Sequence, residues 1–244
     1  MPTLSFIIPA YNESKTIVQL LTKVIDLNLP QAFKKEIIVV DDCSKDDTNS
    51  LVKEVASKYS YIKLLKNPQN LGKSQSVRAG ILESSGDYVV IQDADLEYNP
   101  DDIVFILENM LKHNMDVGYG NRFGKDNGMI YSKNFYGNLL LSFFSNLFTI
   151  GKIRVNIPDM EVCYKLIRGD IARELAIDIV SKSNFGFEPE ITAKLSKYKL
   201  NGDNLKFIIL PISYYPRTYE EGKKMKAFED GFKALIEIIR FNLF

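Results

Sequence analysis

Apolar runs alternate with amphipathic segments along the first half of the chain, a pattern typical of strands and helices in turn. The apolar runs lie at residues 4–8, 36–40, 62–65, 88–91 and 117–119. The amphipathic segments lie at residues 14–26, 46–59, 73–84 and 99–112. Strands that alternate with helices form βαβ units with right-handed crossovers. The pattern therefore predicts an α/β fold with a Rossmann-like, mostly parallel sheet flanked by helices.

The second half of the chain is less regular. Its pattern predicts strands around residues 159–167 and 207–212 and helices at 134–150, 170–179, 189–198 and 225–244. We find neither an internal repeat nor a linker of low complexity, so we expect one domain over residues 1–244.

Two of these helices bear on a membrane contact. In residues 134–150 the polar side chains form one narrow stripe, and the rest of the surface is apolar. A helix of this length spans roughly 25 Å, which is too short to cross a bilayer. Residues 225–244 combine an apolar face with Lys and Arg, as helices in a membrane interface do. The alternative is that both helices pack on the sheet or form a homodimer contact.

Composition limits the kind of chemistry that the chain can carry. Lys and Arg number 31 and Asp and Glu 31, so the net charge is zero and gives no general case for a nucleic-acid partner. A single histidine, His113, excludes a metal site built on several histidines. The two cysteines, Cys43 and Cys163, are typical of a reducing compartment. Carboxylates, Arg and Lys remain as the functional groups.

Polar motifs follow the predicted strands at their carboxyl ends, where sheets of this kind bind their ligands. They are Pro9-Ala10-Tyr11-Asn12-Glu13, Asp41-Asp42, Asp93-Ala94-Asp95 and Asn121-Arg122. Asp93, Asp95 and Glu97 would repel one another unless a cation lay among them, and Mg²⁺ or Mn²⁺ prefers such oxygen ligands. The alternative is a solvated acidic loop that caps the next helix.

The remaining candidates are weaker when each is taken alone. Asp41 and Asp42 could bind ribose hydroxyls or a base, or could serve only the turn. Gly72-Lys73 opens a helix, whose N–H groups could face a phosphate. Arg122 and Arg217 suit phosphate recognition, although surface ion pairs are the commoner outcome. Asp159 and the Glu188/Glu190 pair are the acid or base candidates, and Glu190 could instead be a first-turn helix carboxylate.

Eight ordered motifs together carry a family resemblance. They read IIPAYNE (7–13), VDDCSKDDT (40–48), NLGK (70–73), QDADLEYNP (92–100), GNRF (120–123), DMEVCYK (159–165), FGFEPEITAKL (185–195) and ISYYPRTYEEGKK (212–224). The chain resembles the family 2 inverting glycosyltransferases of the GT-A fold, and more closely their dolichyl-phosphate mannosyltransferase-like branch.

The resemblance implies a role for each matching residue. The nucleotide of a nucleotide-sugar donor would contact Pro9, Ala10, Tyr11, Glu13, Asp41, Asp42, Lys73, Asp93 and Ala94. Asp93, Asp95 and Glu97 would hold Mg²⁺ or Mn²⁺. Asp159, Arg122 and Arg217 would be catalytic, and the acceptor would contact Arg122, Glu190, Arg217 and Lys224. Residues 1–122 would form the donor half and residues 123–244 the acceptor half.

The implied reaction is one displacement at the anomeric carbon. A hydroxyl acceptor would need a general base, for which Asp159 is the candidate, whereas a polyprenyl or dolichyl phosphate is already anionic. The resemblance favours such a lipid phosphate, or another cell-envelope glycan, and a peripheral place at the cytoplasmic face of the membrane. A nucleotidyltransferase and a non-catalytic nucleotide- or sugar-binding module remain as alternatives.

Overall fold

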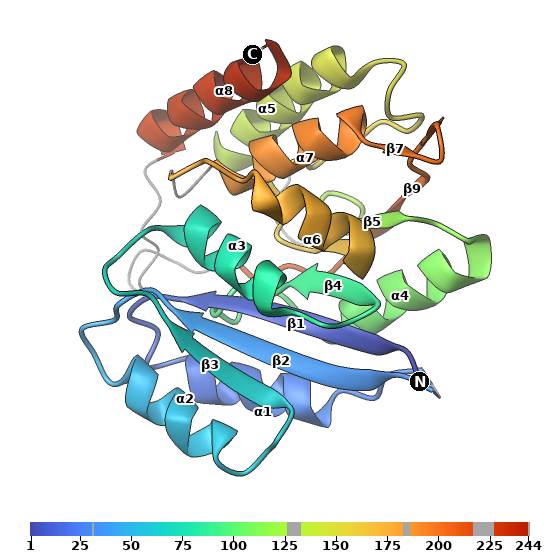
Figure 1. The fold of residues 1–244 in the computed structure, drawn as a ribbon. Helices are drawn as coiled ribbons and strands as arrows, with labels where there is room; N and C mark the ends of the chain where they lie inside the picture. The colour runs from blue at the N-terminus through green and yellow to red at the C-terminus, as the bar shows by residue number, and fades with distance from the viewer. Residues whose placement is uncertain (31, 126–132, 183–185, 217–226, 244) are drawn as a thin grey trace.

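The computed structural model describes residues 1–30, 32–125, 133–182, 186–216 and 227–243 (Figure 1). Its strands are β1 (Thr3–Ala10), β2 (Lys34–Asp41), β3 (Ile62–Lys66), β4 (Tyr88–Ile91), β5 (Val117–Asn121), β6 (Lys165–Arg168), β7 (Lys199–Leu200), β8 (Asp203–Asn204) and β9 (Phe207–Pro211). Its helices are α1 (Ile17–Asp26), α2 (Thr48–Ala56), α3 (Lys73–Glu83), α4 (Asp101–His113), α5 (Lys133–Thr149), α6 (Gly169–Ile177), α7 (Phe187–Lys197) and α8 (Ala227–Leu243).

One seven-stranded sheet organises the described residues, in the order β3-β2-β1-β4-β6-β5-β9. Strands β1 to β4 pair in parallel, whereas β6 runs antiparallel between β4 and β5. Helices α1 and α2 cover one face, and α3 and α6 lie on the other (Figure 1). The predicted α/β fold with a mostly parallel sheet is confirmed. The sheet draws strands from both halves of the chain, since β6 and β9 follow residue 123.

The central strands are buried on both faces, as parallel strands between two helical layers must be. Residues Ile37 to Val40 of β2 expose no surface, and neither do Phe6, Ile7 and Ile8 of β1. This continuous burial explains why the strands read as unbroken apolar runs in the sequence. The carboxyl ends of β1, β2 and β4 meet at one edge, which is where the sequence places its polar motifs.

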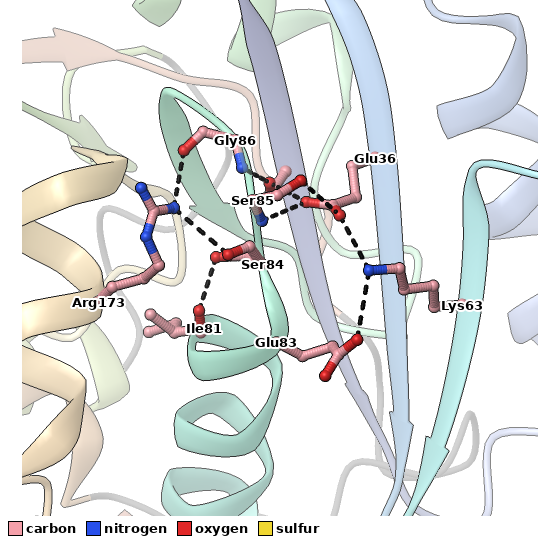
Figure 2. A network of polar contacts seen from close by, with 9 residues as sticks. Glu36, Lys63, Ile81, Glu83, Ser84, Ser85, Gly86 and Arg173 are labelled. Carbon is pink, nitrogen blue, oxygen red and sulfur yellow. Dashed lines mark hydrogen bonds and ion pairs between the residues drawn. The ribbon is translucent and has the colours of Figure 1, made fainter.

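A buried polar network holds the loop between α3 and β4 (Figure 2). The Glu36 carboxylate accepts hydrogen bonds from the Ser5 hydroxyl (2.6 Å) and the Ser85 N–H (2.8 Å), and it pairs with Lys63 (3.3 Å). Burial raises the pKa of Glu36, but the hydrogen bonds from Ser5 and Ser85 outweigh it and hold that pKa below its usual value. This network stabilises the fold at a distance from the candidate site, because it involves the starts of β1 and β2.

A short hairpin, β7–β8, was not among the sequence predictions. It turns at Asn201 and Gly202, which both have positive φ (53° and 91°). Asn-Gly is the preferred pair for such a turn, so the signal was present in the sequence.

Helix α5 is inverted relative to an ordinary surface helix. Its polar residues Ser142, Ser145 and Thr149 are buried, with 1%, 3% and 4% of their surface exposed. Leu141, Phe144 and Phe148 pack on the core, but most of the other large apolar residues point outward. The exposed ones are Tyr136, Leu139, Leu140, Phe143 and Leu147, together with Ile150 just after the helix. Helix α8 lies beside α5 (Figure 1) and exposes Phe232, Ile236, Ile239 and Leu243. We call these ten side chains the apolar face.

Candidate functional site

The loops after β1 and β2 are tied to each other. The Asn12 N–H donates to the Ser44 hydroxyl (3.0 Å), and the Glu13 N–H donates to the Thr48 hydroxyl (2.8 Å). The Ser14 N–H donates to Asp46 (3.1 Å). These bonds fix the backbone of residues 9–13, including half-buried Tyr11, at the edge where a donor would bind. Pro9 and Ala10 close β1, and the Ala10 carbonyl accepts the N–H of Asp42 (2.8 Å).

Asp41 and Asp42 both serve the fold in this structure. Asp41 is fully buried, and its two oxygens accept hydrogen bonds from the Ser44 N–H (2.9 Å) and the Asn49 amide (2.8 Å). Asp42 accepts from the Asn67 amide (2.7 Å) and from the N–H groups of residues 71 and 72 (2.8 Å each). A carboxylate offers about four acceptor positions, so Asp42 has little capacity left for a ligand. A nucleotide contact through either residue stays a prediction.

Lys73 lies between two carboxylates from distant parts of the chain. Gly72, with φ of 85° at the start of α3, lets the chain turn so that Lys73 reaches Asp93 (2.8 Å) and Glu188 of α7 (2.9 Å). Burial lowers the pKa of Lys73, but the charges of Asp93 and Glu188 outweigh it and hold that pKa well above its usual value. For Asp93, burial raises the pKa, and the Lys73 charge overcomes this and lowers it. Lys73 is therefore held protonated at the end of β4, between two carboxylates.

The three carboxylates of the predicted metal set do not form one cluster. Asp93 pairs with Lys73, whereas the nearly buried Glu97 accepts a hydrogen bond from the Tyr214 hydroxyl (2.5 Å). Asp95 accepts the N–H of Glu97 (3.2 Å). Within the described ranges, no group of three or more His, Cys, Asp or Glu side chains is arranged to hold a metal ion. Asp93 and Asp95 still have the oxygen chemistry that suits Mg²⁺ or Mn²⁺, with ligand oxygens to complete the shell.

Arg122 and Asp159 form a buried, two-pronged ion pair. The guanidinium Nε and Nη2 donate to the two Asp159 oxygens (2.7 and 2.6 Å), and the Arg122 N–H adds a third bond (3.0 Å). Asp159 is completely buried, and the Tyr214 ring lies 5.1 Å from the Arg122 guanidinium carbon. Burial lowers the pKa of Arg122, but the Asp159 charge outweighs this and raises it. The pair keeps Arg122 protonated after β5, with its charge balanced by Asp159.

This geometry does not favour the base role expected for Asp159. Both of its oxygens are engaged by Arg122, and no part of the residue reaches solvent. Glu190 is also fully buried, and it accepts the N–H groups of Val180 (2.9 Å) and Ser181 (2.8 Å). Glu190 therefore holds the loop before α7, because its carboxylate is used by backbone groups, and its acceptor contact stays a prediction.

Two predicted site residues, Arg217 and Lys224, lie outside the described residues. Ala94 is buried beside Asp93.

Sequence reasoning assigned no role to three residues that the structure places at this site. These are Glu161, Lys165 and Tyr214. Lys165 is fully buried, donates to the carbonyls of Met160 (2.8 Å) and Val162, and so clamps the turn that carries Asp159. Lys165 and Glu161 lay within the quoted motif DMEVCYK, which was the available signal.

A comparison with protein families shows where the chain belongs. The model of glycosyl transferase family 2 matches residues 5–176. A dolichyl-phosphate beta-glucosyltransferase of Trichomonas vaginalis is 28% identical, over 98% of this chain and 73% of its own length. A dolichol-phosphate mannosyltransferase of Pyrococcus furiosus is 30% identical, over 90% of this chain and 58% of its own length. The chain therefore spans between about half and three quarters of these relatives.

Solved structures agree on the fold. Glucosyl-3-phosphoglycerate synthase of Mycobacterium tuberculosis, crystallised with Mn²⁺, uridine diphosphate and phosphoglyceric acid, has a TM-score of 0.65 at 17% identity, over 99% of this chain and 79% of its own. S. aureus TarS with UDP-GlcNAc has a TM-score of 0.61 at 19% identity, over 100% of this chain and 68% of its own. These likenesses confirm the GT-A fold, and the family match over most of the chain shows that this protein belongs to glycosyl transferase family 2, the nucleotide-sugar-dependent hexosyltransferases.

Proposed function

We propose that this glycosyltransferase moves a hexose from a nucleotide-sugar onto a polyprenyl or dolichyl phosphate at a membrane surface. The observation that carries this proposal is the inverted helix α5, which exposes apolar residues on one side and contacts the neighbours of Arg122 and Asp159 with others. Phe135 of α5 packs edge-on against Phe123, the neighbour of Arg122, with ring centroids 4.8 Å apart. The Ser142 hydroxyl of α5 accepts the N–H of Met160, next to Asp159 (2.9 Å). The same helix thus supports the reaction centre and faces outward with phenylalanine and leucine.

The apolar face gathers ten exposed apolar side chains from α5, its end and the neighbouring helix α8. Exposed apolar patches mark interaction sites. Exposed cations occur on α8, at Lys233 and at Arg240, which pairs with Glu237, and a third is Arg154. Cations beside an apolar helix face favour an anionic lipid surface. Among the described residues, no helix is long and apolar enough to cross a membrane. Peripheral contact is the mode that we propose. We infer the cytoplasmic face of the membrane because a chain with only two cysteines is typical of a reducing compartment.

The donor half, residues 1–122, would hold the nucleotide-sugar. The fixed loops after β1 and β2 would contact the nucleoside, and Lys73 and Asp93 mark where the diphosphate would lie. Asp93 and Asp95 would hold Mg²⁺ or Mn²⁺ together with diphosphate oxygens, and Glu97 would act only through Tyr214. When bound, such an ion would neutralise charge on the departing diphosphate. The Trichomonas and Pyrococcus relatives are named for dolichyl or dolichol phosphate, which supports the same acceptor class here.

The chain's own residues fit an anionic acceptor better than a hydroxyl one. An oxygen of the acceptor phosphate would bond to the anomeric carbon as the bond from that carbon to the diphosphate breaks. The electron pair of the broken bond leaves with the nucleoside diphosphate, and the single displacement inverts the anomeric configuration. A phosphate oxygen is already charged, so no proton has to be removed. Asp159 is then needed to orient Arg122, whose positive charge binds phosphate.

The test supplies matched acceptors to the purified protein with Mg²⁺ or Mn²⁺. Radiolabelled UDP-glucose, UDP-GlcNAc and GDP-mannose are each incubated with a polyprenyl phosphate, with the corresponding polyprenol, and without acceptor. We expect label in the lipid extract only with the phosphate. Transfer to the polyprenol at an equal rate, or transfer to water-soluble glycans alone, would contradict the lipid-phosphate proposal.

A further inference from the structure

One carboxyl group at the site has an oxygen without a partner. Among the described residues, the buried side-chain oxygens that lack a hydrogen bond are Glu161 Oε1 and Asn242 Oδ1. Leaving a buried polar atom unpaired costs stability, so each such atom calls for an explanation. Asn242 lies near the end of α8. Glu161 lies between Asp159 and β6, within the turn that supports the reaction centre.

Hydrogen bonds hold the backbone on both sides of Glu161. Fully buried Lys165 donates to the carbonyls of Met160 and Val162, the residues on either side of Glu161. The Met160 N–H is fixed from the other direction by Ser142 of α5. These contacts tie the backbone next to Glu161 to β6 and to α5. A carboxyl group held in this way is prepared for a partner that arrives from outside.

Charged groups from four elements surround this carboxyl group. Glu188 of α7 repels its charge, whereas Lys165 of β6, Arg122 after β5 and Lys73 of α3 attract it. Burial is the largest influence, and with Glu188 it raises the pKa of Glu161 to about 8. The group is therefore mostly protonated at pH 7. A neutral carboxyl group both donates and accepts a hydrogen bond, so it can pair with a sugar hydroxyl, which does the same.

The charges of both Lys73 and Arg122 act on Glu161, which indicates the part of the substrate that meets it. Lys73 with Asp93 lies on the proposed diphosphate side, and Arg122 with Asp159 lies on the proposed acceptor side. The hexose is the part of the reactants that lies between those two. We infer that Glu161 is a donor-sugar contact that hydrogen-bonds a hydroxyl of the transferred hexose. The inference rests on the proposed function and adds a specificity-determining residue to it.

The test compares binding of a nucleotide-sugar with binding of the bare nucleoside diphosphate, by calorimetry at pH 7 with Mn²⁺. UDP, UDP-glucose, UDP-GlcNAc, GDP and GDP-mannose are titrated into the parent chain, Glu161→Leu and Glu161→Gln. In Glu161→Leu we expect nucleotide-sugar affinity to fall about tenfold or more, with nucleoside-diphosphate affinity within about twofold of the parent. Glu161→Gln keeps a donor and an acceptor, so it should retain most of the affinity. The control Asn242→Leu removes the other unpaired oxygen and should change neither affinity.

Three results would overturn these ideas, and they differ from one another. Parent-like nucleotide-sugar binding by Glu161→Leu refutes the sugar contact alone. An equal loss for nucleotide-sugar and nucleoside diphosphate, with a lowered melting temperature, shows that Glu161 only supports the turn. If the parent binds no nucleotide-sugar of the panel, the proposed function fails and the sugar contact fails with it.

Discussion

The apolar face of α5 and α8 gives a quantitative prediction about membrane binding. Leu140, Phe143 and Leu147 of α5 are 55%, 60% and 52% exposed, so each leaves about half of its side chain open. Burying a whole side chain of this size contributes about 1.5–3 kcal/mol. Moving the three open halves into lipid should therefore contribute roughly 3–4 kcal/mol. Replacing all three by glutamine, which keeps helix propensity, should weaken vesicle partitioning by about a hundredfold to a thousandfold.

The assay is co-sedimentation with vesicles of phosphatidylcholine and phosphatidylglycerol, at low and high salt. Phe144 is left in place because it is half-buried and packs on the core, so changing it would confound stability with binding. The matched control carries Leu82→Gln, Phe105→Gln and Leu111→Gln, which are 41%, 42% and 40% exposed but lie on α3 and α4. The control should partition like the parent, and both variants should keep the parent's affinity for UDP.

The reasoning is refuted if the α5 variant sediments with vesicles as the parent does. It is also refuted if the control loses binding to the same degree as the α5 variant. Salt should weaken the parent's binding, because Arg154, Lys233 and Arg240 each add about 1 kcal/mol at an anionic surface. Binding that salt leaves unchanged would remove these cations from the explanation.

Three further predictions concern the buried charges. Asp159→Asn leaves buried Arg122 without its counter-charge and should lower the free energy of unfolding, measured in urea, by about 3–5 kcal/mol. The control Asp170→Asn breaks the more exposed pair with Arg168 and should lower that free energy by at most about 1 kcal/mol. Glu36→Gln should destabilise the chain above pH 4.5. The difference in unfolding free energy from the parent should shrink as the pH falls through the lowered pKa of Glu36, because that carboxylate stabilises the fold only when ionised. Equal differences at pH 3 and pH 7 in chemical denaturation would contradict this. Asp95→Asn should weaken nucleoside-diphosphate binding far more with Mn²⁺ than without it, and calorimetry that finds equal losses in both conditions would reject Asp95 as a metal ligand.

The sequence by itself determined the order of elements and the edge of the sheet that carries the site. Buried parallel strands need unbroken apolar runs, and those runs located β1 to β5 within a few residues. The polar motifs at their ends followed from the same pattern, because parallel strands bring their carboxyl ends to one edge. The antiparallel direction of β6 did not follow, since a strand of four residues carries no local sign of its direction.

Only the tertiary structure decided what each polar residue does. Lys73 meets Glu188 across 115 positions of sequence, and Arg122 meets Asp159 across 37, so local periodicity could not reveal that these charges are paired. The pairing engages both Asp159 oxygens, and the base role of Asp159 stays a prediction. The polar stripe of α5 was visible in the sequence, yet its direction was not, because either face of a helix can turn inward. Hydrogen bonds from the Met160 N–H to Ser142 and from the Asn146 amide to the Ile157 carbonyl draw the polar stripe inward. Leu140, Phe143 and Leu147 are left exposed on the other side.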